Sequence, residues 1–204
     1  MDAPITYTLL FANIAIYIWI RYMKPDYFEK FAEWPYEIVN HHKYYQVITS
    51  AFLHADLMHI AFNMFTLFSF GPVLEGMFVM NFGQVLGSLY FFLIYFISLL
   101  SGSLLTLVFN YKNPNYIAVG ASGAISGIIF SYVLFSPFSK LLVFFIPMPA
   151  FLFAFVYVGV SIYGVKNKFG NIGHEAHLGG ALGGVIATFL LIDGAFKFFL
   201  SHFS

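Results

Sequence analysis

The chain of 204 residues contains no cysteine. Disulfide bridges, thiolate metal sites and a cysteine nucleophile are therefore excluded. Charge is also scarce, because Asp, Glu, Lys and Arg make up 9% of the residues, against about 25% in an average soluble domain. The two signs cancel to a formal net charge of zero, so nothing indicates a nucleic-acid partner. So little charge is typical of a protein that crosses the bilayer several times.

Hydrophobic residues supply 60% of the chain. They gather in runs that are long enough, or nearly so, to span a bilayer as helices. The runs lie at about residues 5–20, 58–75, 83–109, 122–137, 148–165 and 175–198. The second run is expected to close at Glu75 and Gly76, and the first to be a retained helix, because no signal-peptide pattern is present. No repeat or linker divides the sequence, so residues 1–204 are predicted to form one all-α membrane domain.

The segment between the first two runs, about residues 21–57, is too polar to cross a membrane. It holds most of the charges, together with Trp34 and several tyrosines. Tyrosine and tryptophan are enriched at membrane–water interfaces. We therefore expect a long, ordered first loop that lies on the headgroup layer or partly within it.

The sequence GASGA places Ser122 at the start of the fourth run, where a membrane helix normally has no reactive polar side chain. A hydroxyl buried in hydrocarbon is costly unless it has a partner. Gly120 and Gly123 would let another helix approach closely, and the amides of a helix N-terminus favour developing negative charge. Taken alone, GASGA could also be a packing motif whose serine bonds back to a carbonyl.

The sequence HEAHLGGALGG at the start of the sixth run supplies a candidate partner, His177. Offsets of three and seven residues place His177, Gly180 and Gly184 on one helix face. A histidine above a glycine groove is arranged to meet a closely packed helix, and GASGA offers a matching surface. The alternative is a buried histidine bonded to a carbonyl. Because a serine that can pass its proton to histidine is an activated nucleophile, the sequence favours a pair of Ser122 and His177.

The second run opens with LHADLMHIAFNM, which carries His59 and Asn63 four residues apart on one face. Attack on a peptide bond creates an oxyanion, and these two donors with the amide of Ser122 would suit it. The alternative is hydrogen bonding between helices, which is modest in membranes. His54 falls off that face, and we expect it in the preceding loop, tying the loop to a helix end.

Together these motifs resemble the rhomboid intramembrane serine proteases. The resemblance covers H-x4-H-x3-N at residues 54–63, GASGA at 120–124 and AHLGGALGG at 176–184, in that order. GxxLEG at residues 71–76 also resembles the pattern of the family. The resemblance implies a bundle of six transmembrane helices of the compact bacterial type, with a long interfacial first loop.

The resemblance also implies roles for single residues. Ser122 would be the nucleophile and His177 the general base, a dyad without a carboxylate and without a cofactor. His59, Asn63 and the Ser122 amide would form the oxyanion hole. Glu75 would be a structural anchor.

The substrates implied by the resemblance are transmembrane segments of membrane-anchored proteins. The fifth run and the loop around Lys166–Gly173 would form a lateral gate for them. The protein would lie in a bacterial cytoplasmic membrane with its N-terminus inside. That orientation leaves only Lys140 and Lys197 in the inside loops, so the positive-inside rule favours the opposite orientation.

One position departs from the pattern of the family. Some members carry an aromatic residue four positions after the nucleophile, where it stacks on the catalytic histidine. Here that position is Ser126, about 40° round the helix from Ser122. His177 would then be oriented by Ser126 itself or by a neighbouring aromatic residue.

Two other functions compete with proteolysis. A non-catalytic rhomboid-like protein would bind or escort transmembrane helices, and such a protein would be expected to lose Ser122 or His177, which are both present. A metal site would use His54, His59, His174 and His177. HEAH does not have the spacing of the zinc-binding HExxH motif, and no cluster of carboxylates accompanies it.

Overall fold

The computed structural model describes residues 3–143, 146–167 and 172–204, and most of these residues are helical. The long helices are α1 (Pro4–Ile18), α5 (Leu57–Phe82), α6 (Gln84–Asn110), α7 (Ser122–Phe135), α8 (Ala150–Asn167) and α9 (His174–Leu191). The short helices are η1 (Trp19–Met23), α2 (Tyr27–Phe31), α3 (Pro35–His41), α4 (Gln46–Thr49), η2 (Ser50–Phe52) and α10 (Ala195–Ser201). A hairpin of β1 (Lys140–Val143) and β2 (Ile146–Pro149) joins α7 to α8.

The prediction of an all-α membrane bundle is confirmed. Within the described ranges, four helices are long and apolar enough to cross a bilayer: α1 continued by η1, α5, α6 and α8. A fifth span arises if α9 and α10 count as one, although the chain bends by 107° between them. The apolar α7 has 14 residues, a length of about 21 Å, which is shorter than the hydrocarbon core.

Two predicted helix ends were wrong. The second run does not close at Glu75 and Gly76 but continues to Phe82, because both residues are buried inside the bundle and not at its surface. The sixth run does not continue to residue 198 as one helix. It stops at Leu191, and Gly194 takes a left-handed φ of 75° before α10 begins.

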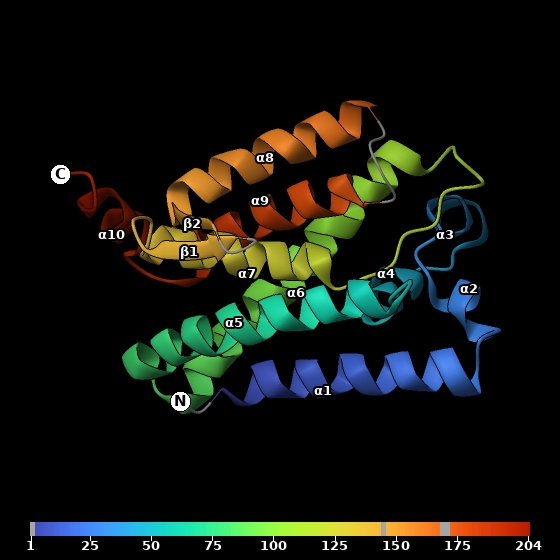
Figure 1. Cartoon of the computed structure of the whole chain (residues 1–204), viewed down its shortest axis with the longest axis horizontal. Helices are drawn as coiled ribbons and strands as arrows, with labels where there is room; N and C mark the ends of the chain where they lie inside the picture. The colour runs from blue at the N-terminus through green and yellow to red at the C-terminus, as the bar shows by residue number, and fades with distance from the viewer. Residues whose placement is uncertain (1–2, 144–145, 168–171) are drawn as a thin grey trace.

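The helices run alternately in opposite directions (Figure 1). α1 and α8 lie along opposite edges of the bundle, with α5, α6, α7 and α9 between them. The short helices α2, α3 and α4 lie at one end, called the loop end below, and the hairpin and α10 lie at the other. Because the direction reverses at each connection, α5, α7 and α9 all begin at the loop end.

The centre of the bundle depends on very close backbone contacts between α7 and α9. A Cβ added to Gly180 would lie 1.9 Å from the carbonyl oxygen of Gly123. One added to Gly184 would lie 2.4 Å from the Cα of Gly127. No larger side chain fits at either contact, so the glycine groove predicted on the sixth run is occupied by the helix of GASGA.

Glu75 joins three helices at the end of the bundle opposite to the loop end. Its carboxylate is fully buried and accepts hydrogen bonds from the amides of Ile5 (3.1 Å) and Thr6 (2.8 Å). The hydroxyls of Thr6 (2.8 Å) and Ser88 (2.7 Å) donate to the same carboxylate. These bonds satisfy amides at the start of α1 that have no partner within the helix, an arrangement that suits the anchor expected from the resemblance.

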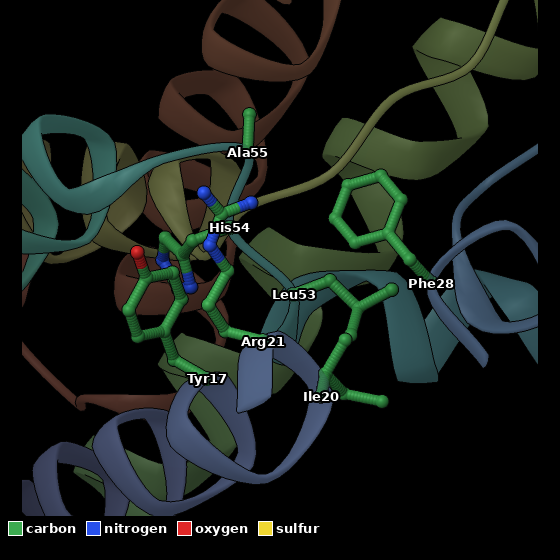
Figure 2. A pocket seen from close by; sticks show the side chains of 7 residues that line it. All are labelled: Tyr17, Ile20, Arg21, Phe28, Leu53, His54 and Ala55. Carbon is green, nitrogen blue, oxygen red and sulfur yellow. The ribbon is translucent and has the colours of Figure 1, made fainter. Parts of the chain in front are cut away.

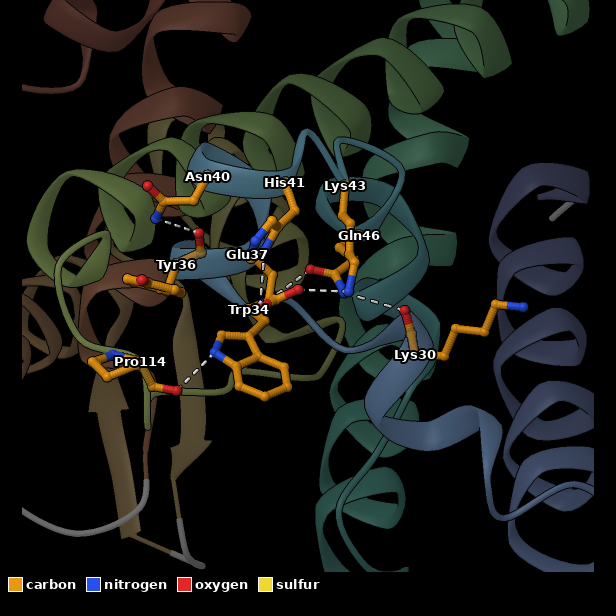
Figure 3. Close-up of polar contacts among 9 residues, drawn as sticks. All are labelled: Lys30, Trp34, Tyr36, Glu37, Asn40, His41, Lys43, Gln46 and Pro114. Carbon is orange, nitrogen blue, oxygen red and sulfur yellow. Dashed lines mark hydrogen bonds and ion pairs between the residues drawn. The ribbon is translucent and has the colours of Figure 1, made fainter.

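The first loop is held by polar contacts (Figure 3). Trp34 Nε1 donates to the carbonyl of Pro114, 2.9 Å away in the connection that leads to α7. The Gln46 side chain, which is 1% exposed, donates to the carbonyl of Lys30 (3.2 Å) and accepts from the Trp34 amide (3.2 Å). Glu37 pairs with Lys43 in the same segment. The segment is therefore ordered and tied to the connection before Ser122.

Candidate active site

The first two turns of α5 present His59 and Asn63 towards the segment before Ser122. The Asp56 carboxylate caps this helix by accepting a hydrogen bond from the His59 amide (2.8 Å). Gly120 has a φ of 122°, and a Cβ added there would lie 2.7 Å from His59 Nε2 and 3.5 Å from Asn63 Nδ2. Asn63 is 7% exposed, and its Nδ2 has no hydrogen-bond partner among the residues that the structure describes. The side-chain amide of Asn63 thus offers an unused hydrogen-bond donor beside the GASGA segment.

Ser122 is the first residue of α7 and is half-buried. Its amide belongs to the first turn, whose N–H groups have no acceptor within the helix. The preceding turn is fixed from outside, because the Gly120 amide donates to the carbonyl of Ser50 (3.0 Å). The nucleophile candidate therefore sits at the positive end of a helix, on a glycine turn that other elements hold in place.

His177 lies in the first turn of α9, opposite the first turn of α7. Its amide donates to the carbonyl of Gly173 (3.1 Å). A Cβ added to Gly123 would lie 3.2 Å from the carbonyl oxygen of Ala176, and Gly180 touches Gly123 directly. The residues beside His177 thus pack against the residue beside Ser122, and the structure brings these two turns together.

Tyr157 of α8 contacts His177 of α9 and Ser126 of α7, although no sequence motif pointed to it. Its ring stacks on that of His177, with centroids 5.8 Å apart and planes at 28°. Its hydroxyl forms a hydrogen bond with Ser126 Oγ. Ser126 Oγ in turn donates to the carbonyl of Ser122 (2.7 Å). The sequence left open whether Ser126 itself or a neighbouring aromatic residue orients His177, and in the structure the ring of Tyr157 stacks on His177 while Ser126 holds the Tyr157 hydroxyl.

His54 lies in the loop before α5, where the sequence placed it, and is 3% exposed. Its ring meets that of His59 edge-on, with centroids 5.0 Å apart. Burial, with a smaller effect from His59, lowers the pKa of His54 to about 3. The imidazole is therefore neutral at any pH at which the protein would work, and it supports the His59 ring without adding charge.

A cavity of about 30 Å³ lies beside His54 and is large enough for a water molecule. The first helix and the first loop supply its remaining walls, and Figure 2 shows the side chains of Arg21 and Tyr17 reaching towards His54. The lining residues are Tyr17, Ile20, Arg21, Phe28, Leu53, His54 and Ala55. This cavity is separate from the contact between α7 and α9.

The sequence offered His54, His59, His174 and His177 as the ligands of a possible metal site. In the part of the chain that the structure describes, no three His, Asp or Glu side chains gather where they could hold an ion. Of the segment expected to form a gate, Lys166–Gly173, residues 168–171 lie outside the described ranges. The helix that precedes it, α8, is lightly packed: 17% of its apolar window is buried, the smallest share among the four spans.

Comparison with known proteins bears on this arrangement. A family model described as the Rhomboid domain matches residues 41–194. "Rhomboid protein 1, mitochondrial" of Saccharomyces cerevisiae is 33% identical over 69% of the chain and 40% of its own length. "RHOMBOID-like protein 12, mitochondrial" of Arabidopsis thaliana is 29% identical over 97% of the chain and 61% of its own length. "Putative rhomboid protease YdcA" of Bacillus subtilis is 31% identical over 74% and 69%. The chain thus spans only part of the length of these relatives.

Proposed function

The chain belongs to the rhomboid family, and from this premise we propose that it is a serine endopeptidase that cleaves transmembrane segments of membrane-anchored proteins. The observation that carries the proposal is the contact between the first turns of α7 and α9. Gly123 and Gly180 touch there, and Ser122 and His177 lie on either side of the contact. This contact supports a pairing of the Ser122 hydroxyl with the His177 imidazole.

The reaction that we propose is acyl transfer. Neutral His177 accepts the proton of Ser122 as the serine oxygen attacks a peptide carbonyl. His177 then protonates the leaving amine, and water hydrolyses the acyl-enzyme, as in serine proteases but without the acidic residue. The ring of Tyr157, which stacks on His177, supplies support for the imidazole.

His59, Asn63 and the Ser122 amide are proposed to hold the oxyanion. The two side chains point at Gly120, two residues before the nucleophile. The unpartnered Nδ2 of Asn63 supports this role, because a buried donor without an acceptor is costly to keep unless a ligand or reacting atom uses it. A preorganised donor of this kind typically contributes about 3 kcal/mol to lowering the barrier.

The substrate is proposed to be a transmembrane helix that unwinds near one end, because a peptide bond within a helix is shielded from attack. The chain is an integral membrane protein, and the family acts within the bilayer. We propose the bacterial cytoplasmic membrane as its location. The relative named YdcA supports this, since it is bacterial and is matched over 69% of its own length.

Substitution of the two central residues tests the proposal. We expect Ser122→Ala and His177→Ala each to abolish cleavage of a reporter transmembrane substrate in liposomes, with the melting temperature unchanged. Ser69→Ala is the matched control for serine, because the Ser69 hydroxyl only bonds back to Phe65 of its own helix (2.8 Å). His202→Ala is the control for histidine, at the opposite end of the bundle. Cleavage by Ser122→Ala at the wild-type rate would exclude the mechanism.

A further inference from the structure

The ring of Tyr157 lies between α7 and α9, against residues of both helices. It lies nearly parallel to the His177 ring, at 28° and 5.8 Å. Phe130 of α7 and Phe153 of α8 contact its sides, with centroids 5.5 Å and 5.6 Å away. Its hydroxyl is hydrogen-bonded to the hydroxyl of Ser126, a residue that is 1% exposed. The ring therefore has little freedom to turn, and it can fix the plane of the imidazole.

Tyr157, which supports the His177 ring, belongs to α8, the most lightly packed of the four candidate spans. Only Ala150, Ser161 and Gly164 of α8 are buried among its described residues. Besides Tyr157, α8 meets α9 at Gly164, where an added Cβ would lie 2.2 Å from the His174 ring. The platform of His177 is thus present only while α8 lies against α7 and α9.

We propose that Tyr157 is the positioning residue of His177 and that the docking of α8 completes the active site. This inference rests on the proposed function, in which His177 is the general base. Ser126 contributes by holding the Tyr157 hydroxyl and the Ser122 carbonyl at once. An open arrangement of α8 would admit a substrate helix but leave the imidazole without its platform. Acylation of Ser122 would then occur only after α8 has packed against α7 and α9 again.

The ring and the hydroxyl of Tyr157 can be separated by substitution. Tyr157→Phe keeps the stacking surface and loses the bond to Ser126. Tyr157→Leu removes both contacts, and Tyr157→Met is a second such variant, with flexible bulk, in case the leucine variant does not fold. Phe155→Leu is the matched control, because Phe155 lies on the same helix, two residues away, and is 75% exposed.

Steady-state kinetics in liposomes provide the test. We expect Tyr157→Leu to lower kcat at least about tenfold, since small misplacements of a reacting group have effects of that size or larger. KM should stay within about twofold, because the substrate does not depend on this ring for binding. Tyr157→Phe should restore kcat to within about threefold of the wild type, and Phe155→Leu should match the wild type.

The possible failures are distinguishable. A wild-type kcat for Tyr157→Leu or Tyr157→Met would overturn the positioning role. Equal losses in the phenylalanine and leucine variants would also overturn it, because the stacked ring would then not be the cause. If Ser122→Ala or His177→Ala keeps cleaving, the proposed function itself fails, and the result for Tyr157 has no bearing on that failure.

Discussion

At the scale of single residues, Asn63 offers a sharp prediction. Asn63→Ala removes an amide donor beside Gly120, and we expect kcat to fall by about a hundredfold, the usual loss for one oxyanion donor. His59→Ala should act in the same direction. KM should change little in either variant, since the interaction forms only in the transition state. Kinetics with a reporter substrate provide the measurement, and a pure KM effect would reassign these side chains to substrate positioning.

The residues of the candidate active site could be predicted from the sequence unequally well. Short sequence motifs contain Ser122, His177, His59 and Asn63. The spacing within each motif shows which residues share a helix face, and this can be inferred without knowing the fold. Tyr157 stands in no motif and reaches His177 from another helix. Its role follows only from packing between α8 and α9, which a sequence pattern does not contain.

At the scale of elements, α7 and α9 lie so close together that we expect no side-chain carbon to fit at the glycines where they touch. Gly180→Ala would place a methyl group 1.9 Å from the backbone oxygen of Gly123, so the helices must separate. We expect a lower melting temperature and a loss of cleavage. Gly159→Ala is the control, because nothing lies within 4 Å of the added Cβ on α8. That variant should be as stable as the wild type or slightly more so.

Thermal unfolding in detergent, together with cleavage assays, measures both variants. Equal stability and activity of Gly180→Ala and Gly159→Ala would contradict the close contact on which the site depends. A loss in Gly159→Ala alone would do so as well.

The helix ends that were predicted wrongly have two different causes, and local hydropathy shows neither of them. Glu75 reads as the end of a span because a carboxylate rarely lies inside one. It is inside because two amides and two hydroxyls surround it, and three of these four donors come from the first helix, about 70 residues away in sequence. The break before α10 occurs at Gly194, whose left-handed φ is not visible in an apolar run. The strands β1 (Lys140–Val143) and β2 (Ile146–Pro149) were missed for a similar reason, since both are short apolar stretches between two helical runs.

At the scale of the whole molecule, Glu33 ties the first loop to the rest. Its backbone pairs with that of Ala118, four residues before Ser122, through two hydrogen bonds of 2.9 Å. Its carboxyl group accepts a hydrogen bond from Ser103 of α6 (2.6 Å) and is 5% exposed. Burial, only partly offset by the Ser103 bond, raises the pKa of Glu33 to about 8. Both ion pairs in the described structure are at Glu37, so no cation offsets the charge of Glu33.

This pKa predicts that stability falls as the pH rises. Between the ordinary value of 4.5 and about 8, the folded protein keeps a proton on Glu33 that the unfolded chain has lost. The free energy of unfolding therefore decreases across that window, by an amount on the order of a few kcal/mol, and levels off above it. Glu33→Gln, which stays neutral and can still accept from Ser103, should remove most of this dependence and be more stable than the wild type at pH 9.

Melting temperatures at pH 5 and pH 9 measure the effect. Glu29→Gln is the control, because Glu29 is exposed in the same loop. If the melting temperatures of the wild type and Glu33→Gln fall equally between pH 5 and pH 9, the charge of Glu33 is not the cause of the lost stability.

The arrangement of the whole bundle follows from a simple feature of the sequence. Helical runs joined by connections reverse direction at each step, so the second, fourth and sixth runs all begin at one end. The three motifs stand at those three beginnings. Their meeting at the loop end was thus predictable from their order, whereas the orientation of that end in the bilayer was not, because the basic residues and the resemblance to the family point in opposite directions.

Labelling of the intact protein in liposomes with a serine-directed phosphonate, followed by peptide mapping, tests the central claim most directly. Ser122 should be the one modified residue, and labelling should be lost in His177→Ala, because the serine is activated only through the imidazole. Modification of a different serine, or undiminished labelling of Ser122 in His177→Ala, would contradict the account.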